Sequence, residues 1–360
     1  MFIKKVFLKA MRICSAFLGY LYPIRPVLIK LSAKPRQVNF AVTNACNANC
    51  IFCAYRYMKR QKSVMPVDLF KKALADFVDI GGGDVAFIPV VGDAFLDPYL
   101  LERIRYARSF SRIKNIGLLT NGIAIDKFSI KDILSSGVSS ITVSFGGFNR
   151  DFYKKIFGVD QFQRALENIV NLASLNRDSG YPVRISLALR IDKPLGLIRK
   201  DPIYQQLAVL INDITYSYKF DSWSGRIKQN DLTGVMRIVS NEKITKPCSM
   251  LYADGPTVLE DGRVTVCGCR DLADDDSLIL GNIRDESLIS LWGSEKLKRL
   301  REGFYKADIP ALCRECGHYA SIDIYRRLHS RKMANQNYID FCNSDYYKRK
   351  KQLNYSLKHS

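Results

Sequence analysis

The sequence lacks an apolar run long enough to cross a membrane. The run near its start, ICSAFLGYLYPI at 13–24, has twelve uncharged residues and contains Pro23, whereas a transmembrane helix needs about 20 apolar residues. Such a helix is therefore not expected. A cleaved signal peptide stays open as the less favoured alternative, because Lys9 and Arg12 cut short the apolar stretch that a signal peptide needs. We expect a cytoplasmic protein in a thiol-reducing setting.

Acidic residues are absent from both ends of the chain. Residues 1–36 hold eight Lys and Arg and residues 346–360 hold five, which together make up thirteen of the formal net charge of +20. The body of the chain is thus only mildly basic. This distribution argues against a nucleic-acid groove along the core and favours ends that meet an anionic surface. A nucleic-acid modifying or non-catalytic binding protein is the least favoured class.

Residues 1–36 predict a basic amphipathic segment. Apolar residues follow helical spacing on one face, and Lys4, Lys5, Lys9 and Arg12 lie away from it. That face consists of Ile3, Val6, Phe7, Ala10, Ile13, Cys14, Phe17, Leu18 and Leu21. The helix would either lie on an anionic membrane surface or pack on the outside of the protein.

Internal repeats and Gly/Ser linkers are also missing, and apolar runs alternate with helix-length amphipathic stretches instead. This alternation predicts an α/β fold built from βα units with a parallel sheet. Residues 66–80 read as one of the helices, with Pro66 in its first turn. The expected strands are VNFAVT (38–43), VAFIPVV (85–91), IGLLT (116–120), SITVSF (140–145), VRISLALR (183–190) and ITYSY (214–218). After residue 223 shorter strands predict a second domain, whose LEDGRVTVCGC is expected to form a hairpin turning at Asp261-Gly262.

Cys46, Cys50 and Cys53 lie in the loop after the first expected strand, with no histidine and no further cysteine nearby. Three thiolates are an incomplete tetrahedral set. They would leave an open position on a zinc ion, or one iron of a [4Fe-4S] cluster free to bind another molecule. A closed structural zinc site is less favoured.

Cys248, Cys267, Cys313 and Cys316 form a second, complete set of four thiols. The first pair brackets the expected hairpin and the second is a Cys-x2-Cys. On spacing alone, a zinc ribbon and an iron-sulfur cluster are equally compatible with this set. Cys269 is an alternative ligand because it lies two residues beyond Cys267 on a strand. Cys342 and Cys14 have no assigned role.

The Cys-x3-Cys-x2-Cys spacing, with Phe52 before the last cysteine, resembles that of the radical S-adenosylmethionine (SAM) enzymes. The resemblance implies a partial (β/α)6 TIM-like barrel whose cluster loop lies at the carboxyl ends of the strands. It also implies that Cys46, Cys50 and Cys53 hold a catalytic [4Fe-4S] cluster. SAM would then chelate the open iron and be cleaved to a 5′-deoxyadenosyl radical that abstracts hydrogen from a substrate.

Further stretches resemble SAM-contacting segments of that family. VVGDAFLDP (90–98) puts Val91, Gly92 and Asp93 where the family has Gly-Gly-Glu, so its carbonyls and Asp93 are expected to receive the SAM ammonium. In the other stretches, LLTNG and VSFGG and the end of the fifth expected strand, the candidate SAM contacts are Thr120, Asn121, Ser144 and Arg190. Phe52 in the cysteine loop is a further candidate. Arg190 could pair with the SAM carboxylate. The alternatives are an ordinary turn at 91–93 and a solvated Arg190.

Cys-x13-Gly-x4-Cys followed by Cys-x2-Cys is similar to the SPASM/Twitch extension of these enzymes, and GNIRDESLISLWGSEKLKRLRE (281–302) to its connecting segment. No further cysteines follow within about ten residues of Cys316, so the match is to the shortened form, a small α+β domain with one auxiliary [4Fe-4S] cluster. The expected organisation is a basic N-terminal segment at 1–36, a radical SAM barrel at 37–227, an auxiliary-cluster domain at 228–325 and a basic tail at 326–360.

A fully ligated second cluster suits electron transfer. The resemblance therefore implies an oxidoreductase that acts on a sugar-like or other small molecule, with the auxiliary cluster as electron acceptor. Maturation of a peptide or protein side chain is the alternative. An electron donor such as a flavodoxin or ferredoxin is the expected protein partner.

Overall fold

The structure, a computed structural model, describes residues 34–239, 244, 247–252, 255–267, 276–314 and 316–319. The amphipathic segment expected at 1–36 lies outside these ranges except for its last three residues. The expected tail at 326–360 and Cys14, Cys269 and Cys342 also lie outside the described residues. Within the described ranges, no helix combines the length and the hydropathy that crossing a bilayer requires.

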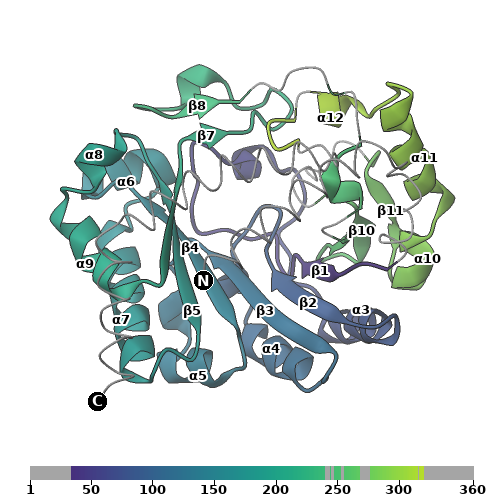
Figure 1. Ribbon diagram of the computed structural model, residues 1–360, viewed down its shortest axis with the longest axis horizontal. Coiled ribbons are helices and arrows are strands. Elements are labelled where there is room, and N and C mark those ends of the chain that lie inside the picture. Colours follow the sequence, from purple (N-terminus) through teal and green to yellow (C-terminus); the bar gives the residue numbers. More distant parts are fainter. Residues whose placement is uncertain are drawn as a thin grey trace, which may run out of the picture.

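A nine-stranded sheet organises the chain (Figure 1), in the order β11-β10-β9-β1-β2-β3-β4-β5-β6. Strands β1 to β6 are parallel neighbours in chain order. In the described chain β6 pairs with β5 alone, so the curved sheet stays open and forms a partial (β/α)6 TIM-like barrel, as predicted. The six strands are β1 Gln37–Phe40, β2 Gly83–Phe87, β3 Ile113–Thr120, β4 Ser140–Gly146, β5 Arg184–Arg190 and β6 Asp213–Ser217.

Helices lie along the outer face of the parallel strands (Figure 1). Their bounds are α3 Val67–Asp79, α4 Leu100–Arg108, α5 Ile130–Ser135, α6 Arg150–Phe157, α7 Phe162–Asp178, α8 Leu195–Ile198 and α9 Pro202–Leu210. Short 3-10 turns are η1 Ala54–Tyr57, η2 Ala94–Leu96 and η3 Ile125–Lys127. Helix α3 shows why they form, because Phe70, Leu74 and Phe77 recur at helical spacing and are all buried. Pro66 was expected in the first turn of this helix. It is instead the N-cap, one residue before the helix begins.

The C-terminal part continues the barrel sheet. Strand β9 pairs in parallel with β1 through Asn39↔Thr257 and Phe40↔Val258, and the expected hairpin forms between β9 and β10, with Gly262 at φ 91° in its turn. Strand β7 pairs with β8 across the boundary expected at 227/228. The bounds in this part are β7 Lys219–Phe220, η4 Gln229–Asp231, β8 Arg237–Ile238, η5 Ser249–Leu251, β9 Thr257–Val258, β10 Arg263–Thr265, β11 Ile279–Asn282, α10 Leu288–Trp292, α11 Glu295–Tyr305 and α12 Ala311–Arg314.

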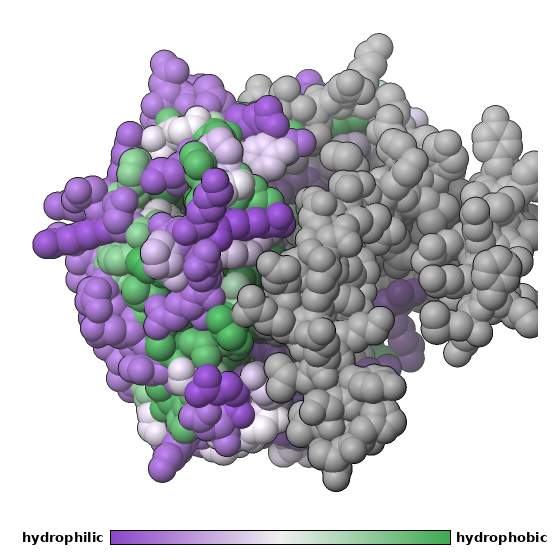
Figure 2. All heavy atoms as spheres, turned by 60° about the vertical axis from the view of Figure 1, so that its left-hand side comes forward, coloured by the Kyte–Doolittle hydropathy of each residue, from purple (hydrophilic) through white to green (hydrophobic). Residues whose placement is uncertain are grey.

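One apolar core spans both parts of the chain. Phe40 of β1, Phe87 of β2 and Trp292 of α10 belong to the same buried cluster. The C-terminal elements are therefore packed on the barrel and not tethered beside it. The face that carries α8 and α9 is largely hydrophilic with apolar surface showing between charged side chains (Figure 2), and Leu197 and Val209 are the most exposed large apolar residues described there.

Candidate functional site

The loop that carries the first three cysteines follows β1 and is docked on the end of helix α6. The N–H groups of Asn49 and Ile51 donate to the carbonyls of Phe157 and Ile156, at 2.8 and 2.9 Å. These carbonyls belong to the last turn of α6 and have no partner within the helix. Gly158 follows at φ 69°, and a Cβ there would lie 2.2 Å from the Asn49 carbonyl oxygen. Glycine therefore permits the loop to approach the helix.

Cys46, Cys50 and Cys53 converge within this loop. All three are partly buried and reduced, and each thiol lies within electrostatic range of another. Burial raises the pKa of Cys46 to about 12, with Asp93 and Cys53 adding to the rise. Burial also raises the pKa of Cys50 and Cys53. The thiolate forms are thus favoured only when a cationic centre binds them, which fits three ligands for one iron-sulfur cluster.

No three His, Cys, Asp or Glu side chains of the described residues are arranged to hold a single metal ion. An iron-sulfur cluster does not require thiols that converge on a single ion, because each of its cysteines binds a separate iron. Two N–H donors already face one thiol: those of the Ala48 backbone and the Asn121 side chain lie 3.5 and 3.8 Å from Cys46 Sγ. Such donors stabilise sulfur that carries negative charge.

The end of β2 packs directly on the cysteine loop. Gly92 adopts φ 136°, and a Cβ there would lie 2.7 Å from the Thr43 carbonyl oxygen and 3.0 Å from that of Ala45. The Asp93 N–H donates to the Ala45 carbonyl at 2.8 Å. The stretch predicted from the resemblance is therefore in contact with the backbone just before Cys46.

The Asp93 carboxylate is buried and fully engaged by protein donors. It accepts from the N–H of Phe95 at 3.0 Å, the N–H of Asn121 at 2.7 Å and the hydroxyl of Thr120. Desolvation raises the pKa of Asp93 to about 6, against the pull of these hydrogen bonds. The Asp93 side chain thus links the ends of β2 and β3 by hydrogen bonds, a role that the sequence did not suggest.

Asn121 connects β3 to the cysteine loop. Its Nδ2 donates to Asn47 Oδ1 at 2.7 Å, while its Oδ1 accepts from the Ile123 N–H at 2.9 Å. Asn121 and Thr120 are both buried. The two residues expected beside SAM therefore lie directly behind the loop, and one of them faces a thiol.

Ser144 and Arg190, predicted from separate strands, are brought together at the ends of β4 and β5. The Arg190 Nε donates to Ser144 Oγ at 2.9 Å, and the guanidinium lies 5.4 Å from the centre of the Phe52 ring. Burial lowers the pKa of Arg190, while Cys50 and Cys53 act in the opposite direction. A partly buried cation thus faces two of the thiols, which opposes the alternative of a fully solvated Arg190.

The second set of cysteines comes from three separate segments. Cys248 precedes η5, Cys267 follows β10, and Cys313 lies in α12 with Cys316 just beyond it. All four are partly buried and none forms a disulfide. The Cys316 N–H bonds the Cys313 carbonyl at 3.3 Å, so the Cys-x2-Cys forms a tight turn.

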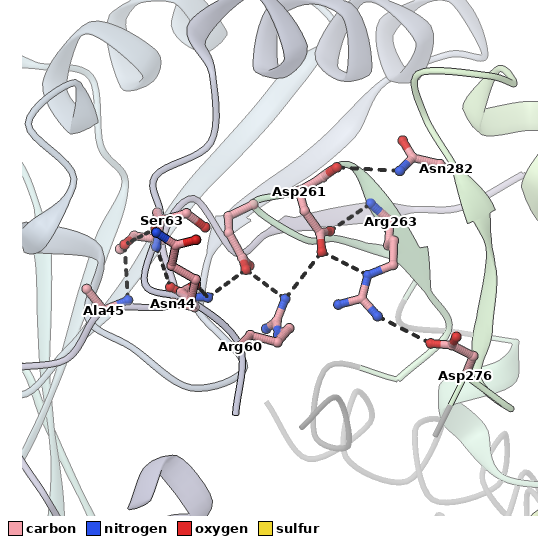
Figure 3. Close-up of polar contacts among 11 residues, drawn as sticks. Asn44, Ala45, Arg60, Ser63, Asp261, Arg263, Asp276 and Asn282 are labelled. Carbon is pink, nitrogen blue, oxygen red and sulfur yellow. Dashed lines mark hydrogen bonds and ion pairs between the residues drawn. The ribbon is translucent and has the colours of Figure 1, made fainter. Parts of the chain in front are cut away.

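A polar junction, largely buried at Glu260 and Arg60, joins the cysteine loop to the C-terminal hairpin (Figure 3). Glu260 accepts from Asn44 Nδ2 at 2.8 Å and from Arg60 at 2.7 Å. Arg60 also lies 3.7 Å from Asp261, which in turn pairs with Arg263 at 2.8 Å. Sequence reasoning missed Asn44, Arg60 and Glu260. The only local signal was the turn at Asp261-Gly262, which predicts a hairpin but no partner for it.

Comparisons with known proteins agree with this geometry. The Radical SAM superfamily model matches residues 40–185, and the SPASM iron-sulfur cluster-binding domain model matches residues 248–317. GTP 3′,8-cyclase of Chlorobaculum tepidum is 26% identical over 141 residues, 38% of this chain and 42% of that protein. The chain thus spans about two fifths of that relative's length.

Two solved structures are similar in fold. BtrN in complex with AdoMet and 2-DOIA is 13% identical, with a TM-score of 0.51 over 80% of this chain and 94% of that one. SuiB of Streptococcus suis bound to its precursor peptide SuiA is 12% identical, with a TM-score of 0.57 over 81% of this chain and 72% of that one. The two family matches fall on the two cysteine sets. The chain thus contains a Radical SAM superfamily domain followed by a SPASM iron-sulfur cluster-binding domain, and its cofactors are SAM and [4Fe-4S] clusters.

Proposed function

We propose that the protein is an oxidoreductase that removes a hydrogen atom from a carbon centre of a sugar-like or other small molecule, with an auxiliary cluster as acceptor of the second electron. One observation carries this proposal: the barrel loop offers three converging thiols, whereas the C-terminal part offers four. The first set leaves an iron open for SAM. The second is complete without substrate and therefore suits electron transfer.

SAM bound at the three-cysteine cluster supplies a 5′-deoxyadenosyl radical that takes the hydrogen atom. The residues of this chain hold and orient SAM. Arg190, kept in place by Ser144 and by the Phe52 ring, receives the SAM carboxylate through its remaining guanidinium N–H groups. Since protein donors already occupy the Asp93 carboxylate, the backbone carbonyls around Gly92 receive the SAM ammonium.

The substrate carbon gives one hydrogen atom to the radical, forming 5′-deoxyadenosine. The hydroxyl on that carbon then loses its proton to solvent and the substrate radical loses one electron, which leaves a carbonyl. Cys248, Cys267, Cys313 and Cys316 would hold the auxiliary cluster, which would supply the acceptor for that electron. The electron would then be available to the first cluster or to an external flavodoxin or ferredoxin, so the oxidation would need no net reductant.

Iron and sulfide analysis tests the two sites. Anaerobically reconstituted protein should hold about eight irons and eight sulfides, the content of two [4Fe-4S] clusters. Replacement of Cys46, Cys50 and Cys53 by alanine should remove half of them, and replacement of the other four cysteines should remove the other half. Zinc without labile sulfide in the second set would refute the auxiliary cluster.

Turnover tests the reaction. Reduced protein with SAM should release 5′-deoxyadenosine, and Cys50→Ala should abolish the release. With a sugar-like substrate, one SAM should be consumed per oxidised product without stoichiometric reductant. The peptide alternative, which has a counterpart in the peptide-bound SuiB fold, would be favoured by hydrogen abstraction from a peptide and none from small molecules. A stoichiometric need for external electrons would contradict the oxidative assignment.

A further inference from the structure

The carboxylate of Asp221 joins two segments that are far apart in the chain. Asp221 directly follows β7 and is buried. One of its oxygens accepts the N–H of Trp223 at 2.6 Å, and the other accepts the N–H of Gly317. Gly317 follows Cys316 directly. The contact therefore fixes the backbone next to a thiol of the second cysteine set.

The second segment is shaped for this approach. A Cβ at residue 317 would lie 2.9 Å from Asp221 Oδ1 and 3.0 Å from the Val239 carbonyl oxygen. Both distances are tighter than ordinary side-chain contacts. Glycine at this position lets the backbone after Cys316 reach the carboxylate.

Trp223 carries the connection onward to the first cysteine loop. Its indole Nε1 donates to the Phe52 carbonyl at 3.2 Å, and its side chain packs in the same small apolar cluster as Cys53 and Tyr55. Phe52 precedes Cys53 directly. The turn that starts at Asp221 is thus hydrogen-bonded to the backbone beside a ligand of each set.

This turn is held in a strained conformation. Trp223 and Ser224 have φ values of 50° and 57°, a left-handed region that non-glycine residues rarely occupy. Two such residues in succession persist only where surrounding contacts over-determine them. The hydrogen bonds from Trp223 to Asp221 and to Phe52 are contacts of this kind.

We propose that Asp221 is a positioning residue that fixes the auxiliary-cluster loop relative to the SAM-cluster loop through Gly317 on one side and Trp223 on the other. This inference rests on the proposed function, because it takes Cys316 and Cys53 as ligands of two different clusters. We call the set of Asp221, Trp223, Gly317 and the Phe52 carbonyl the Asp221–Trp223 joint. This joint holds the two cluster loops in one arrangement. Asp221 also places a buried negative group close to the auxiliary cluster.

The charge of Asp221 predicts an effect on the reduction potential of the auxiliary cluster. A buried anion near a cluster disfavours the addition of an electron, and screening by water is weak there. Asp221→Asn keeps the size of the side chain but removes the charge, and its amide N–H2 meets one of the two N–H donors. The reduction potential of the auxiliary cluster should therefore shift upward.

Redox titration of the Cys46→Ala/Cys50→Ala/Cys53→Ala protein, which keeps only the auxiliary cluster, measures this shift by electron paramagnetic resonance. Asp201→Asn is the matched control, because Asp201 accepts the N–H of Ile203 at 2.9 Å in the same i to i+2 geometry but lies at the start of α9. We expect an upward shift for Asp221→Asn and none for Asp201→Asn. Equal potentials in all three proteins would overturn the claim that the Asp221 charge acts on the auxiliary cluster.

Hydrogen–deuterium exchange of the cluster-loaded full chain tests the joint separately. Asp221→Asn should speed exchange both in residues 222–225 and in residues 316–319, and Gly317→Ala should give the same pair of changes from the other side. Faster exchange confined to residues 222–225 would mean that Asp221 stabilises only the turn that follows it, and would refute the inference. A triple-cysteine variant that holds no iron would instead refute the auxiliary cluster, and the exchange pattern would still decide whether the joint exists.

Discussion

The hydroxyl of Thr120 lies 3.0 and 2.9 Å from the two carboxylate oxygens of Asp93. The same hydroxyl accepts the N–H of Gly122 at 3.0 Å. The ends of β2 and β3 are therefore tied together by a buried polar contact beside the cysteine loop. Because the Asp93 N–H also bonds the Ala45 carbonyl, the charge state of this carboxylate bears on how firmly the loop is held.

The raised pKa of Asp93 predicts a pH dependence of stability. Burial raises this pKa from 3.8 to about 6, so the folded state binds the proton more tightly than the unfolded chain does. The contribution of Asp93 is then most favourable below pH of about 4 and is lost as pH rises to about 6, an effect of about 3 kcal/mol.

The difference in free energy of unfolding between wild type and Asp93→Asn, measured in iron-free reduced protein, isolates this contribution. Asp126→Asn is the control of opposite sign, because pairing with Arg164 lowers the pKa of Asp126 and its small contribution is lost as pH falls. A difference for Asp93 that stays constant between pH of about 4 and about 7 would show that its pKa is not raised.

Gly92→Ala should detach the cysteine loop from β2. A Cβ would lie 2.7 Å from the Thr43 carbonyl oxygen, on a residue with φ 136°, and neither the backbone nor the loop can give way cheaply. We expect the variant to lose the first cluster, about half of the iron of the wild type. Gly196→Ala is the control, since nothing lies within 4 Å of the added Cβ. Full iron content in Gly92→Ala would contradict the close packing.

The parallel strands could be predicted because buried strands are short apolar runs bounded by turn residues. The residues at which these strands end could not be predicted in this way. The run VNFAVT continues to residue 43, but β1 ends at Phe40. Pairing with β2 ends at Asn39 and pairing with β9 ends at Phe40, and both ends depend on where these neighbouring strands diverge from β1.

The contacts that join the two parts of the site were also beyond sequence reasoning. Asn44 meets Glu260 across 216 residues, and Trp223 meets Phe52 across 171. No periodicity encodes such a pairing. A family resemblance supplies the candidate ligands and the candidate SAM contacts, whereas the polar residues between the loops depend on how this chain packs its hairpin on β1.

Tyr153→Phe should stabilise the iron-free protein. The Tyr153 hydroxyl is buried and has no hydrogen-bond partner among the described residues, while the ring stacks on Phe157 at 4.5 Å. Removal of an unpaired buried hydroxyl, with the ring kept, should raise the free energy of unfolding by about 1 kcal/mol.

Tyr216→Phe is the matched control for that variant. The hydroxyls of Tyr216 and Tyr204 lie 2.7 Å apart, so Tyr216→Phe should destabilise by about 1 kcal/mol. Urea unfolding under reducing conditions measures both variants. A loss of stability in Tyr153→Phe would mean that its hydroxyl has a hydrogen-bond partner in the iron-free protein.

Glu260→Gln should weaken the junction between the cysteine loop and the C-terminal hairpin. The side chains of Glu260 and Arg60 are only 2% and 11% exposed, so the substitution leaves a buried guanidinium without its nearest anion. Glutamine still offers an oxygen to Asn44 and Arg60, and Asp261 remains 3.7 Å from Arg60. We therefore expect a destabilisation of about 2 kcal/mol, somewhat less than the loss of a fully buried partner costs.

The effect should reach the first cluster as well as global stability. Asn44 bonds Glu260 directly and precedes Cys46 by two residues, so a loosened junction should speed the release of iron to a chelator. Asp160→Asn is the control, because Asp160 pairs with Arg150 at 2.7 Å on the surface, where solvent screens the charges. It should change neither the unfolding midpoint nor iron release. If Glu260→Gln lowered stability but released iron at the wild-type rate, the junction would hold the hairpin on the barrel without holding the cluster loop.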